Sequence, residues 1–360
     1  MTSKKPFYHH KAFQLTVGIA VSVLCMWLAL RPILNDDDAW DQLVFAFRTA
    51  DYRTLPVILI VLFIFYWLKA WRWRLMLAPI GQFRPVKDLL PPIMIGFSFN
   101  NLLPAHLGEF VRCFVFSKQQ KVPVAVSISS VVLERVFDVI AILLYLGIGL
   151  IFIEGVDPSV KKTAYVFAGA AAALVLGGIV YVIWTKPFVN LVEKILKMIT
   201  FIPHSLTDKL CEMLEAGAKG LASLKHGPLL FAIVVISIIK WAFNGSLILL
   251  ALWSFDISVS PVVAMVLLGV VAFGVTVPSS PGYFGVIQLC FMLVLELFVQ
   301  NKPAIFAASV YYHMSQYIPV TLIGMLYFLR SGMSIAQVEE EKEEADEHLG
   351  GQVELNPAES

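Results

Sequence analysis

Six long apolar stretches recur along this 360-residue chain, and they constrain its fold more than any other feature. A helix of about 17 to 25 apolar residues crosses the hydrocarbon core of a bilayer, and each stretch meets that length. Only 15% of the residues are charged, against about 25% in soluble proteins, so the chain lacks the charges to cover a water-exposed surface. We therefore predict an all-α integral membrane protein whose six full transmembrane helices are Ala12–Leu30, Leu55–Trp71, Val124–Ile153, Thr163–Trp184, Leu229–Trp253 and Ala304–Leu329.

Two further apolar stretches are interrupted by turn-forming residues. Leu89–Ser117 breaks at Asn100-Asn101-Leu102-Leu103-Pro104, and Pro261–Phe298 breaks at Val277-Pro278-Ser279-Ser280-Pro281-Gly282. A backbone break at membrane depth must be buried in protein or line a wet cavity, because lipid cannot hydrogen-bond it. We predict two re-entrant helical hairpins in an inverted-repeat arrangement; the alternative is a pair of kinked ordinary spans.

The distribution of basic residues favours the re-entrant arrangement and gives an orientation. With both hairpins re-entrant, seventeen basic residues, including Lys69 and Arg72, fall on one face and six on the other. The basic face is expected to be cytoplasmic. This predicts a membrane protein with Met1, Lys209 and Ser360 in the cytoplasm, and with Asp37 and Asp157 outside.

The expected organisation is one polytopic membrane domain over residues 1–330, followed by a tail. Residues 185–228 place apolar side chains and lysines at helical spacing, which predicts a cytoplasmic amphipathic segment on the anionic leaflet; a solvated connector is the alternative. Residues 331–360 are acidic and lack aromatic side chains, which predicts a mostly disordered cytoplasmic tail.

Each interrupted stretch carries Pro-x3-Gly at the start of an apolar helix, from Pro104 to Gly108 and from Pro281 to Gly285. Similar interruptions in the two halves of a membrane protein indicate a transporter's binding region near the membrane midplane. The candidate binding residues at these breaks, with His313 as a further possibility, are Asn100, Asn101, His106, Pro281, Gly282, Gly285 and Gln288.

Ionisable residues lie next to the first break and within two predicted spans. Their formal charges sum to zero, and their sequence spacing pairs Glu109 with Arg112 and Arg135 with Asp138. A charge at membrane depth costs about 3 kcal/mol or more, so such groups mark either a functional cavity or an ion network that holds helices together. We favour a substrate site formed by Glu109, Arg112, Glu134, Arg135, Asp138 and Lys240.

Enzyme motifs are poorly represented. Asp37-Asp38-Ala39-Trp40-Asp41 has the DDxxD form that binds magnesium on diphosphates, but it occurs once, without a partner motif. No Walker loop, HExxH, GxSxG or Rossmann fingerprint is present, and the four cysteines form no metal-binding pattern. We predict a protein that is not an enzyme and that has no cofactor, no metal site and no nucleic-acid partner.

Three motifs together resemble the lysylphosphatidylglycerol synthase transmembrane family, the flippase-like domains of multiple peptide resistance factors. They are Asn101-Leu102-Leu103-Pro104-x-x-x-Gly108-Glu109-x-x-Arg112, then Glu134-Arg135-x-x-Asp138, and Ser280-Pro281-Gly282-x-x-Gly285. The resemblance implies a bacterial inner-membrane protein that moves lipid between leaflets. It does not extend to a synthase domain, because only the acidic tail follows Arg330.

The family pattern differs here at His106, Gln288 and His313, which leaves aminoacylated phospholipid, ordinary phospholipid and polyprenyl-linked lipid open as substrates. We expect a lipid flippase or scramblase in which Arg112 and Arg135 hold the lipid phosphate, since a guanidinium presents a planar fork of donors. We also expect Arg135→Ala to destabilise more than Asn101→Ala. The alternatives are a small-solute or ion transporter and a non-transporting subunit for lipid-linked glycan or envelope synthesis.

Overall fold

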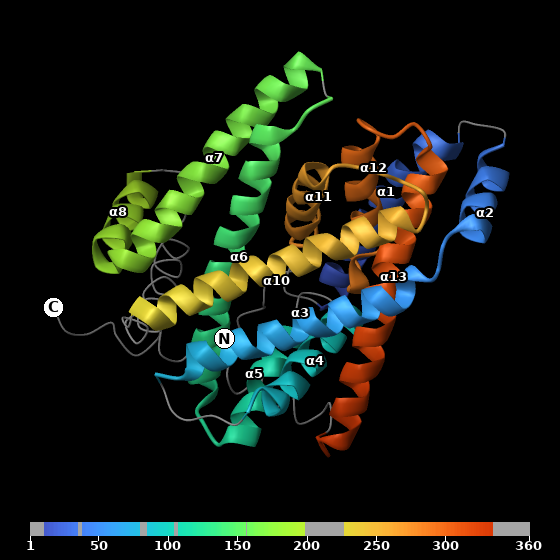
Figure 1. Ribbon diagram of the computed structural model, residues 1–360. Coiled ribbons are helices and arrows are strands. Elements are labelled where there is room, and N and C mark those ends of the chain that lie inside the picture. Colours follow the sequence, from blue (N-terminus) through green and yellow to red (C-terminus); the bar gives the residue numbers. More distant parts are fainter. Residues whose placement is uncertain are drawn as a thin grey trace, which may run out of the picture.

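The computed structural model describes residues 11–34, 38–79, 85–103, 107–155, 157–198 and 227–333, and within these ranges it contains helices and no strand. Figure 1 shows how these helices are arranged. In chain order they are α1 Lys11–Leu34, α2 Ala39–Thr49, α3 Thr54–Leu77, α4 Val86–Leu102, α5 Leu107–Gln120, α6 Val124–Phe152, α7 Pro158–Ile183, α8 Thr185–Met198, α10 Gly227–Trp253, α11 Pro261–Gly274, the 3-10 turn η2 Pro281–Tyr283, α12 Val286–Leu295 and α13 Lys302–Arg330.

Four helices are long and apolar enough to cross a membrane: Leu15–Leu34, Thr54–Leu77, Val126–Phe152 and Gly227–Trp253. They coincide with four of the six predicted spans. The other two predicted spans, Thr163–Trp184 and Ala304–Leu329, lie within α7 and α13, which have 26 and 29 residues. The apolar α11 and α12 are shorter, as expected for the two arms of an interrupted stretch.

Three helices begin after a polar capping residue and have a proline at their first or second position, a combination that favours the start of a helix. The Asp157 carboxylate accepts a hydrogen bond from the Ser159 backbone N–H (2.8 Å) before α7. The Asn301 side chain accepts one from the Ala304 N–H (3.0 Å) before α13, and Ser260 caps α11 in the same way.

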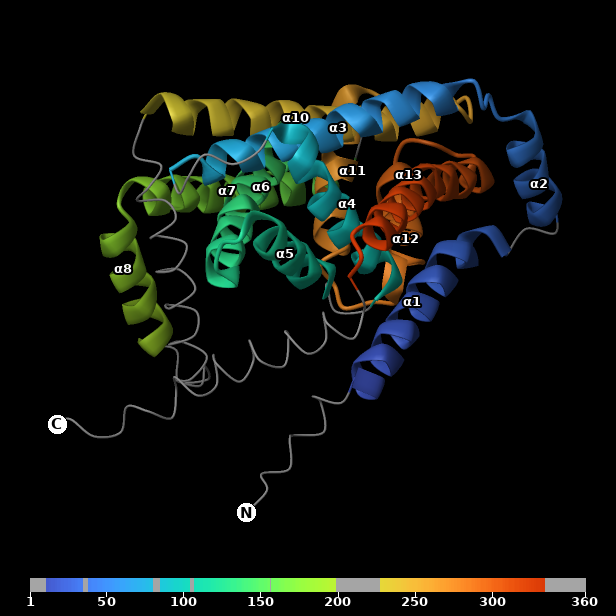
Figure 2. The same cartoon turned by 90° about the horizontal axis from the view of Figure 1, so that it is seen from below.

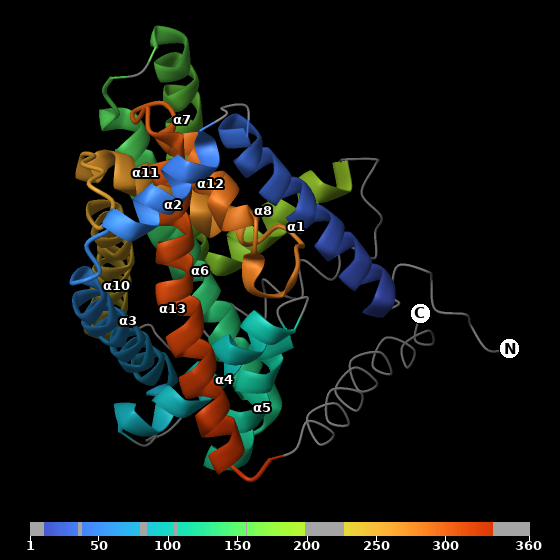
Figure 3. The same ribbon diagram turned by 90° about the vertical axis from the view of Figure 1, so that its right-hand side faces the viewer.

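The two interrupted stretches form helix pairs, α4 with α5 and α11 with α12, and the members of each pair pack against each other. In Figures 1 and 3 the α4–α5 pair lies toward the lower end of the molecule and the α11–α12 pair toward the upper end. Helix α4 nevertheless contacts η2, the turn at the break of the second pair. The first pair therefore reaches the break of the second. Figure 2 shows α3 and α10 side by side along one face of these elements.

Glycines allow the backbones of the first pair to approach closely. A Cβ on Gly108 would lie 1.9 Å from the Gly96 carbonyl oxygen, and a Cβ on Gly96 would lie 2.7 Å from the Gly108 carbonyl oxygen. Helix α13 packs on α4 in the same way, because a Cβ on Gly324 would lie 2.2 Å from the Met94 carbonyl oxygen. Inside a membrane the hydrophobic effect does not drive helices together, so their association depends on van der Waals packing. Small residues strengthen this packing because they let the backbones approach closely.

The break of the second pair is held by α1. The Ser22 hydroxyl donates to the Ser280 hydroxyl (2.7 Å) and accepts from the Ser280 backbone N–H (2.9 Å). Gly285 has φ +84°, and a Cβ there would lie 2.3 Å from the Ser22 carbonyl oxygen, so a glycine is required for both reasons. The Pro-x3-Gly glycine is thus a position of close backbone approach in both halves of the chain.

The amphipathic segment predicted over 185–228 begins with a helix, α8, in which Leu191 and Ile195 are exposed on the outside. Its position on a membrane surface stays a prediction. One helix was not expected from the sequence: α2 lies in the loop after the first span and buries Leu43 and Ala46. The tail from 334 onward lies outside the described residues.

Candidate functional site

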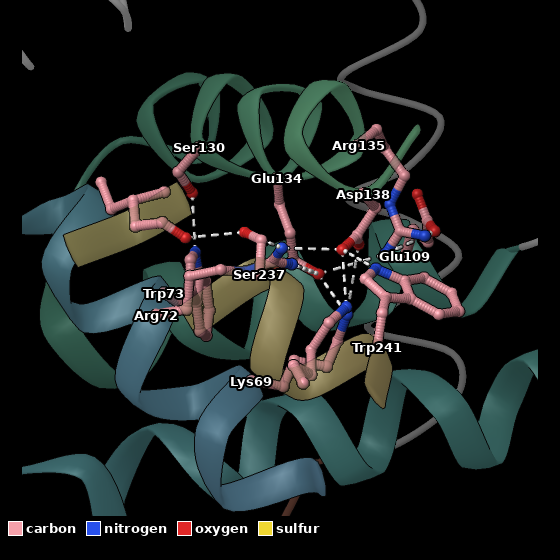
Figure 4. A network of polar contacts seen from close by, with 12 residues as sticks. Lys69, Arg72, Trp73, Glu109, Ser130, Glu134, Arg135, Asp138, Ser237 and Trp241 are labelled. Atoms are coloured by element: carbon pink, nitrogen blue, oxygen red, sulfur yellow. Dashed lines mark hydrogen bonds and ion pairs between the residues drawn. The ribbon is translucent and has the colours of Figure 1, made fainter. Parts of the chain in front are cut away.

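Glu134 of α6 is fully buried and lies among four cations, three of which, Lys69, Arg72 and Arg135, are labelled in Figure 4. Arg112 of α5 donates to both of its carboxylate oxygens, at 3.2 Å and 2.8 Å. Lys69 of α3 donates to Oε1, and Arg72 brings its Nη2 to 3.7 Å from the same oxygen. The bidentate pair between Arg112 and Glu134 is strong and directional. Together with the contacts from Lys69 and Arg72, it makes Glu134 the residue that joins α3, α5 and α6.

Asp138, one helical turn after Glu134, is the second centre of charge. Its Oδ1 accepts hydrogen bonds from Arg72 Nη1 (2.7 Å), Lys240 Nζ (2.5 Å) and Trp241 Nε1 (2.9 Å). Arg72 also donates to the Ser237 hydroxyl at 2.9 Å. Because Lys240, Trp241 and Ser237 belong to α10, Asp138 links that helix to α3 and α6.

Arg135 and Glu109 form the accessible edge of this arrangement. Arg135 Nη2 lies 3.4 Å from Glu109 Oε1 and 3.2 Å from Glu134 Oε1. The Arg135 side chain is 42% exposed and that of Glu109 34%, whereas Glu134 is inaccessible. Tyr283 lies in η2, the turn at the break of the second pair, and α4 of the first pair contacts this turn. The break of the second pair is thus near the helix pair that carries Glu109.

We define the ion cluster as the eight charged residues that these contacts join: Lys69, Arg72, Glu109, Arg112, Glu134, Arg135, Asp138 and Lys240. All six charged residues predicted from the sequence belong to it. The charges of these six sum to zero, but the ion cluster also contains two cations that were not predicted to belong to it, Lys69 and Arg72. Five cations and three carboxylates give the ion cluster a formal charge of +2.

The expected pairing along each helix was also wrong. Arg112 pairs with Glu134 on the next helix instead of with Glu109, and Arg135 pairs with Glu109 and Glu134 instead of with Asp138. A buried guanidinium gains more from a two-pronged contact across helices than from a neighbour on its own exposed face. The predicted effect of Arg135→Ala rested on the earlier pairing, and Glu134 retains Lys69 and Arg112 without it.

Lys69 and Arg72 were misplaced by the sequence interpretation, which assigned them to the cytoplasmic loop after the second span. Both are buried, at 2% and 0% exposure, because α3 continues to Leu77. A signal was available: Lys69, Arg72 and Trp73 are spaced at i, i+3 and i+4, and the apolar run resumes after Arg74 with Leu75-Met76-Leu77. Removing these two residues from the loop count does not reverse the charge asymmetry.

Aromatic rings lie against three of the four buried cations, Lys69, Arg112 and Lys240. The Arg112 guanidinium lies 4.0 Å from the centroid of the Trp73 ring, and Lys240 Nζ lies 4.3 Å from that of Trp241. Trp73 itself donates to the Ser130 hydroxyl at 3.0 Å. An aromatic ring beside a buried cation offsets part of its lost hydration. Because the ring carries no formal charge, it does so without neutralising the cation.

The residues predicted at the first break have separate roles. The Asn100 side chain accepts a hydrogen bond from the Gly108 backbone N–H (2.8 Å), so it caps the start of α5 across the break. Asn101 donates to the Thr321 hydroxyl of α13 at 2.8 Å. His106 lies outside the described residues.

The residues predicted at the second break form a structural turn. Pro281 begins η2, and Gly282 has φ +77°, a conformation that favours glycine. Gln288 accepts from the Gly285 backbone N–H at 2.8 Å, and its amide lies 3.3 Å from His313 Nδ1. Neither Gln288 nor His313 contacts the ion cluster by a described ion pair or hydrogen bond.

A cavity of about 1290 Å³ lies elsewhere, between α2, the end of α10 and the start of α13. Asp41, Asp51 and Asp256 line it, and none of the predicted site residues does. Asp51 is already bonded to Arg53 at 3.0 Å. In the described ranges no group of three metal-binding side chains is found, here or in the ion cluster.

Comparisons with known proteins identify relatives over most of the chain. Over 340 residues it is 23% identical to a Haloferax volcanii protein named glycosyltransferase AglD, with 86% of this chain and 53% of that protein covered. The chain thus spans about half the length of that relative. It is 25% identical over 275 residues to the UPF0104 membrane protein MJ1595 of Methanocaldococcus jannaschii, covering 72% of this chain and 79% of that one. No solved structure shows significant similarity.

A family match covers residues 15–324, described as the lysylphosphatidylglycerol synthase TM region. It includes all four apolar helices, both interrupted stretches and the whole ion cluster. The protein is a multi-pass membrane protein, and its chain belongs to the lysylphosphatidylglycerol synthase TM region family.

Proposed function

We propose that this protein moves a lipid with a phosphate-bearing head group between the two leaflets of a membrane. The observation that carries the proposal is the ion cluster: a largely buried site of formal charge +2 with an accessible edge formed by Arg135 and Glu109. A structural ion network would balance its own charges, because each unpaired charge at membrane depth costs about 3 kcal/mol or more. An excess of cations instead favours an anionic substrate.

A lipid phosphate that enters hydrocarbon without protein contacts meets a prohibitive loss of hydration. The ion cluster supplies fixed positive charge along part of such a path. The N-terminus of α5, beside the first break, and that of α12, beside the second, add backbone N–H groups and the positive ends of helix dipoles. A head group exchanged between these two ends would keep hydrogen-bond donors throughout its passage.

The two arginines expected to bind phosphate contribute differently to this mechanism. Arg135 stands at the edge with an exposed side chain, so it would contact an incoming phosphate first. Arg112 is buried with its fork on Glu134, so a phosphate would replace this carboxylate as its acceptor. Such an exchange needs no net gain or loss of hydrogen bonds at Arg112, which keeps the barrier for binding and release low.

The proposed membrane arrangement has six full spans and two re-entrant hairpins, α4–α5 and α11–α12, that enter from opposite faces. Its support is the opposite placement of these pairs in the molecule together with the distribution of basic residues. The polytopic domain would cover residues 1–330, with the 185–228 segment, the acidic tail and both termini in the cytoplasm. The expected bacterial inner membrane remains part of this proposal.

This arrangement predicts the accessibility of introduced cysteines in sealed cells. Lys162→Cys, on the loop side of α7, should react with a membrane-impermeant maleimide, whereas Lys118→Cys, at the end of α5, should react only after lysis. Both lysines are exposed, so burial does not explain a difference. Strong labelling at position 118 in sealed cells would contradict the re-entrant first hairpin.

A second candidate is a membrane subunit that assists the synthesis of a lipid-linked glycan without transport. The similarity to a protein named glycosyltransferase AglD favours it, although this chain spans about half of that protein. Both candidates have a lipid phosphate as ligand and neither requires catalysis by this chain. They differ in whether the isolated protein moves lipid.

Reconstitution separates the candidates. Purified protein in liposomes should accelerate the loss of fluorescent phospholipids from the outer leaflet to the inner one, measured by dithionite quenching. Encapsulated soluble dye in the same vesicles should be retained. Lipid movement at the rate of protein-free vesicles would favour the assisting subunit, and dye leakage would favour a solute pathway.

A further inference from the structure

Charge does not balance in the buried core of the ion cluster. In the described part of the chain, every ion pair of its four buried cations goes to one of two carboxylates. These six residues, each exposed by 3% or less, are Lys69, Arg72, Arg112 and Lys240, with Glu134 and Asp138. The core thus has a formal charge of +2. The edge pair, Arg135 with Glu109, adds no net charge.

Unpaired hydrogen-bond donors accompany this excess charge. Nε and Nη2 of Arg72 and Nε of Arg112 are buried and make no hydrogen bond. The two guanidinium groups are neighbours, because Arg72 Nη2 and Arg112 Nη1 lie 3.7 Å and 3.2 Å from the same Glu134 oxygen. A buried donor without an acceptor is costly, so the core lacks acceptors as well as negative charge.

We propose that the ion cluster binds a doubly charged phosphate, the phosphomonoester or diphosphate end of a lipid, in preference to the singly charged phosphodiester of ordinary phospholipids. The inference rests on the proposed function and specifies its substrate class. A terminal phosphate carries about −1.5 to −2 charges near neutral pH and three strong acceptor oxygens. A phosphodiester carries one charge and two free oxygens. Only the terminal phosphate matches both the charge of the core and its three unpaired nitrogen atoms.

Two lipids with identical acyl chains test this preference. Dioleoyl phosphatidic acid ends in a phosphomonoester, whereas dioleoyl phosphatidylglycerol contains a phosphodiester. Each is titrated into the purified full-length protein in detergent at about pH 8, above the second ionisation of phosphate near 6, and the thermal-unfolding midpoint gives the affinity. We expect phosphatidic acid to bind about tenfold more tightly, because it satisfies at least one further charged hydrogen bond.

Inorganic phosphate is the third probe, because it has the charge without the lipid. It should compete with phosphatidic acid only at much higher concentration. Equal affinity for inorganic phosphate would assign the site to a free anion and overturn the lipid assignment. Equal affinity for the two lipids, or binding of neither, would overturn the preference for double charge.

A charge added beside Arg72 tests the same claim from the protein side. Ser237 is buried, and its hydroxyl accepts from Arg72 Nη1, so Ser237→Asp lowers the formal charge of the core to +1. Ser237→Asn is a control of matched size without the charge. Without ligand, Ser237→Asp should unfold at a higher temperature than Ser237→Asn, and its preference for phosphatidic acid should fall to about threefold or less.

A Ser237→Asp protein that is less stable than Ser237→Asn and keeps the full preference would show that the core is already balanced. The liposome assay distinguishes this failure from failure of the proposed function. Translocation of both lipids at equal rates contradicts the preference alone. Preferential binding of phosphatidic acid without translocation of any lipid contradicts the proposed function alone.

Discussion

Glu134→Gln should remove most of the folded protein. The substitution keeps the size of the side chain but leaves Lys69, Arg112 and Arg135 without the carboxylate that they share. Breaking a buried ion pair by neutralising one partner costs about 3 to 5 kcal/mol, since the other charge stays buried. That loss is comparable to the whole stability of a small domain. The yield of monodisperse protein in size-exclusion chromatography and the thermal-unfolding midpoint measure it.

The matched control is Glu154→Gln, which neutralises an exposed carboxylate just after α6 and should change neither quantity. A double variant, Glu134→Gln with Lys69→Met, should recover part of the loss, because it removes one of the cations left unpaired. If Glu134→Gln folded as well as the parent, the charges of the ion cluster would not be coupled through this residue.

Gly108→Ala should open the first helix pair. The added Cβ would lie 1.9 Å from the Gly96 carbonyl oxygen and 2.6 Å from the Asn100 backbone nitrogen, so α4 and α5 must separate. Overpacking a close contact costs about 1 to 3 kcal/mol, and here the clash involves backbone atoms, which cannot rotate away. We expect a lower unfolding midpoint and loss of the Asn100 cap on α5.

Gly169→Ala is the matched control within α7, where no atom lies within 4 Å of the new Cβ. Alanine is favoured over glycine inside a helix by about 1 kcal/mol, so this variant should be as stable as the parent or more so. A Gly108→Ala protein of parental stability would mean that α4 and α5 are not in close backbone contact.

Much of the fold could be predicted from the sequence, because long apolar runs have few other uses. The interruption of both shorter stretches was predictable from their prolines. The common spacing singled out Gly108 and Gly285, but the close backbone approach at each is visible only in the structure. Helix α2 was not predicted because it is short and amphipathic and follows a run of aspartates, so it does not resemble an apolar span.

The members of the ion cluster were easier to predict than their partners. A charged residue within a long apolar stretch is easily recognised in the sequence, as Glu134, Asp138 and Lys240 are. A lysine or arginine near the end of an apolar stretch, such as Lys69 or Arg72, normally extends its charged group to the membrane–water interface. These two residues are buried only because α3 packs against α6 and α10. The partner of Arg112 depends on the packing of α5 against α6, which the spacing of residues along one helix does not indicate.

Leaflet-resolved translocation by an Arg112→Lys protein tests most directly whether the ion cluster conducts a lipid phosphate. Lysine keeps the positive charge beside Glu134 but loses the planar fork and the stacking on Trp73. Arg53→Lys, at an arginine whose side chain is 92% exposed, is the matched control. With folding verified by size-exclusion chromatography, Arg112→Lys should translocate lipid about tenfold more slowly than the parent, and Arg53→Lys at the parental rate. Parental translocation by Arg112→Lys would show that Arg112 only braces α5 against α6, and would contradict a phosphate path through the ion cluster.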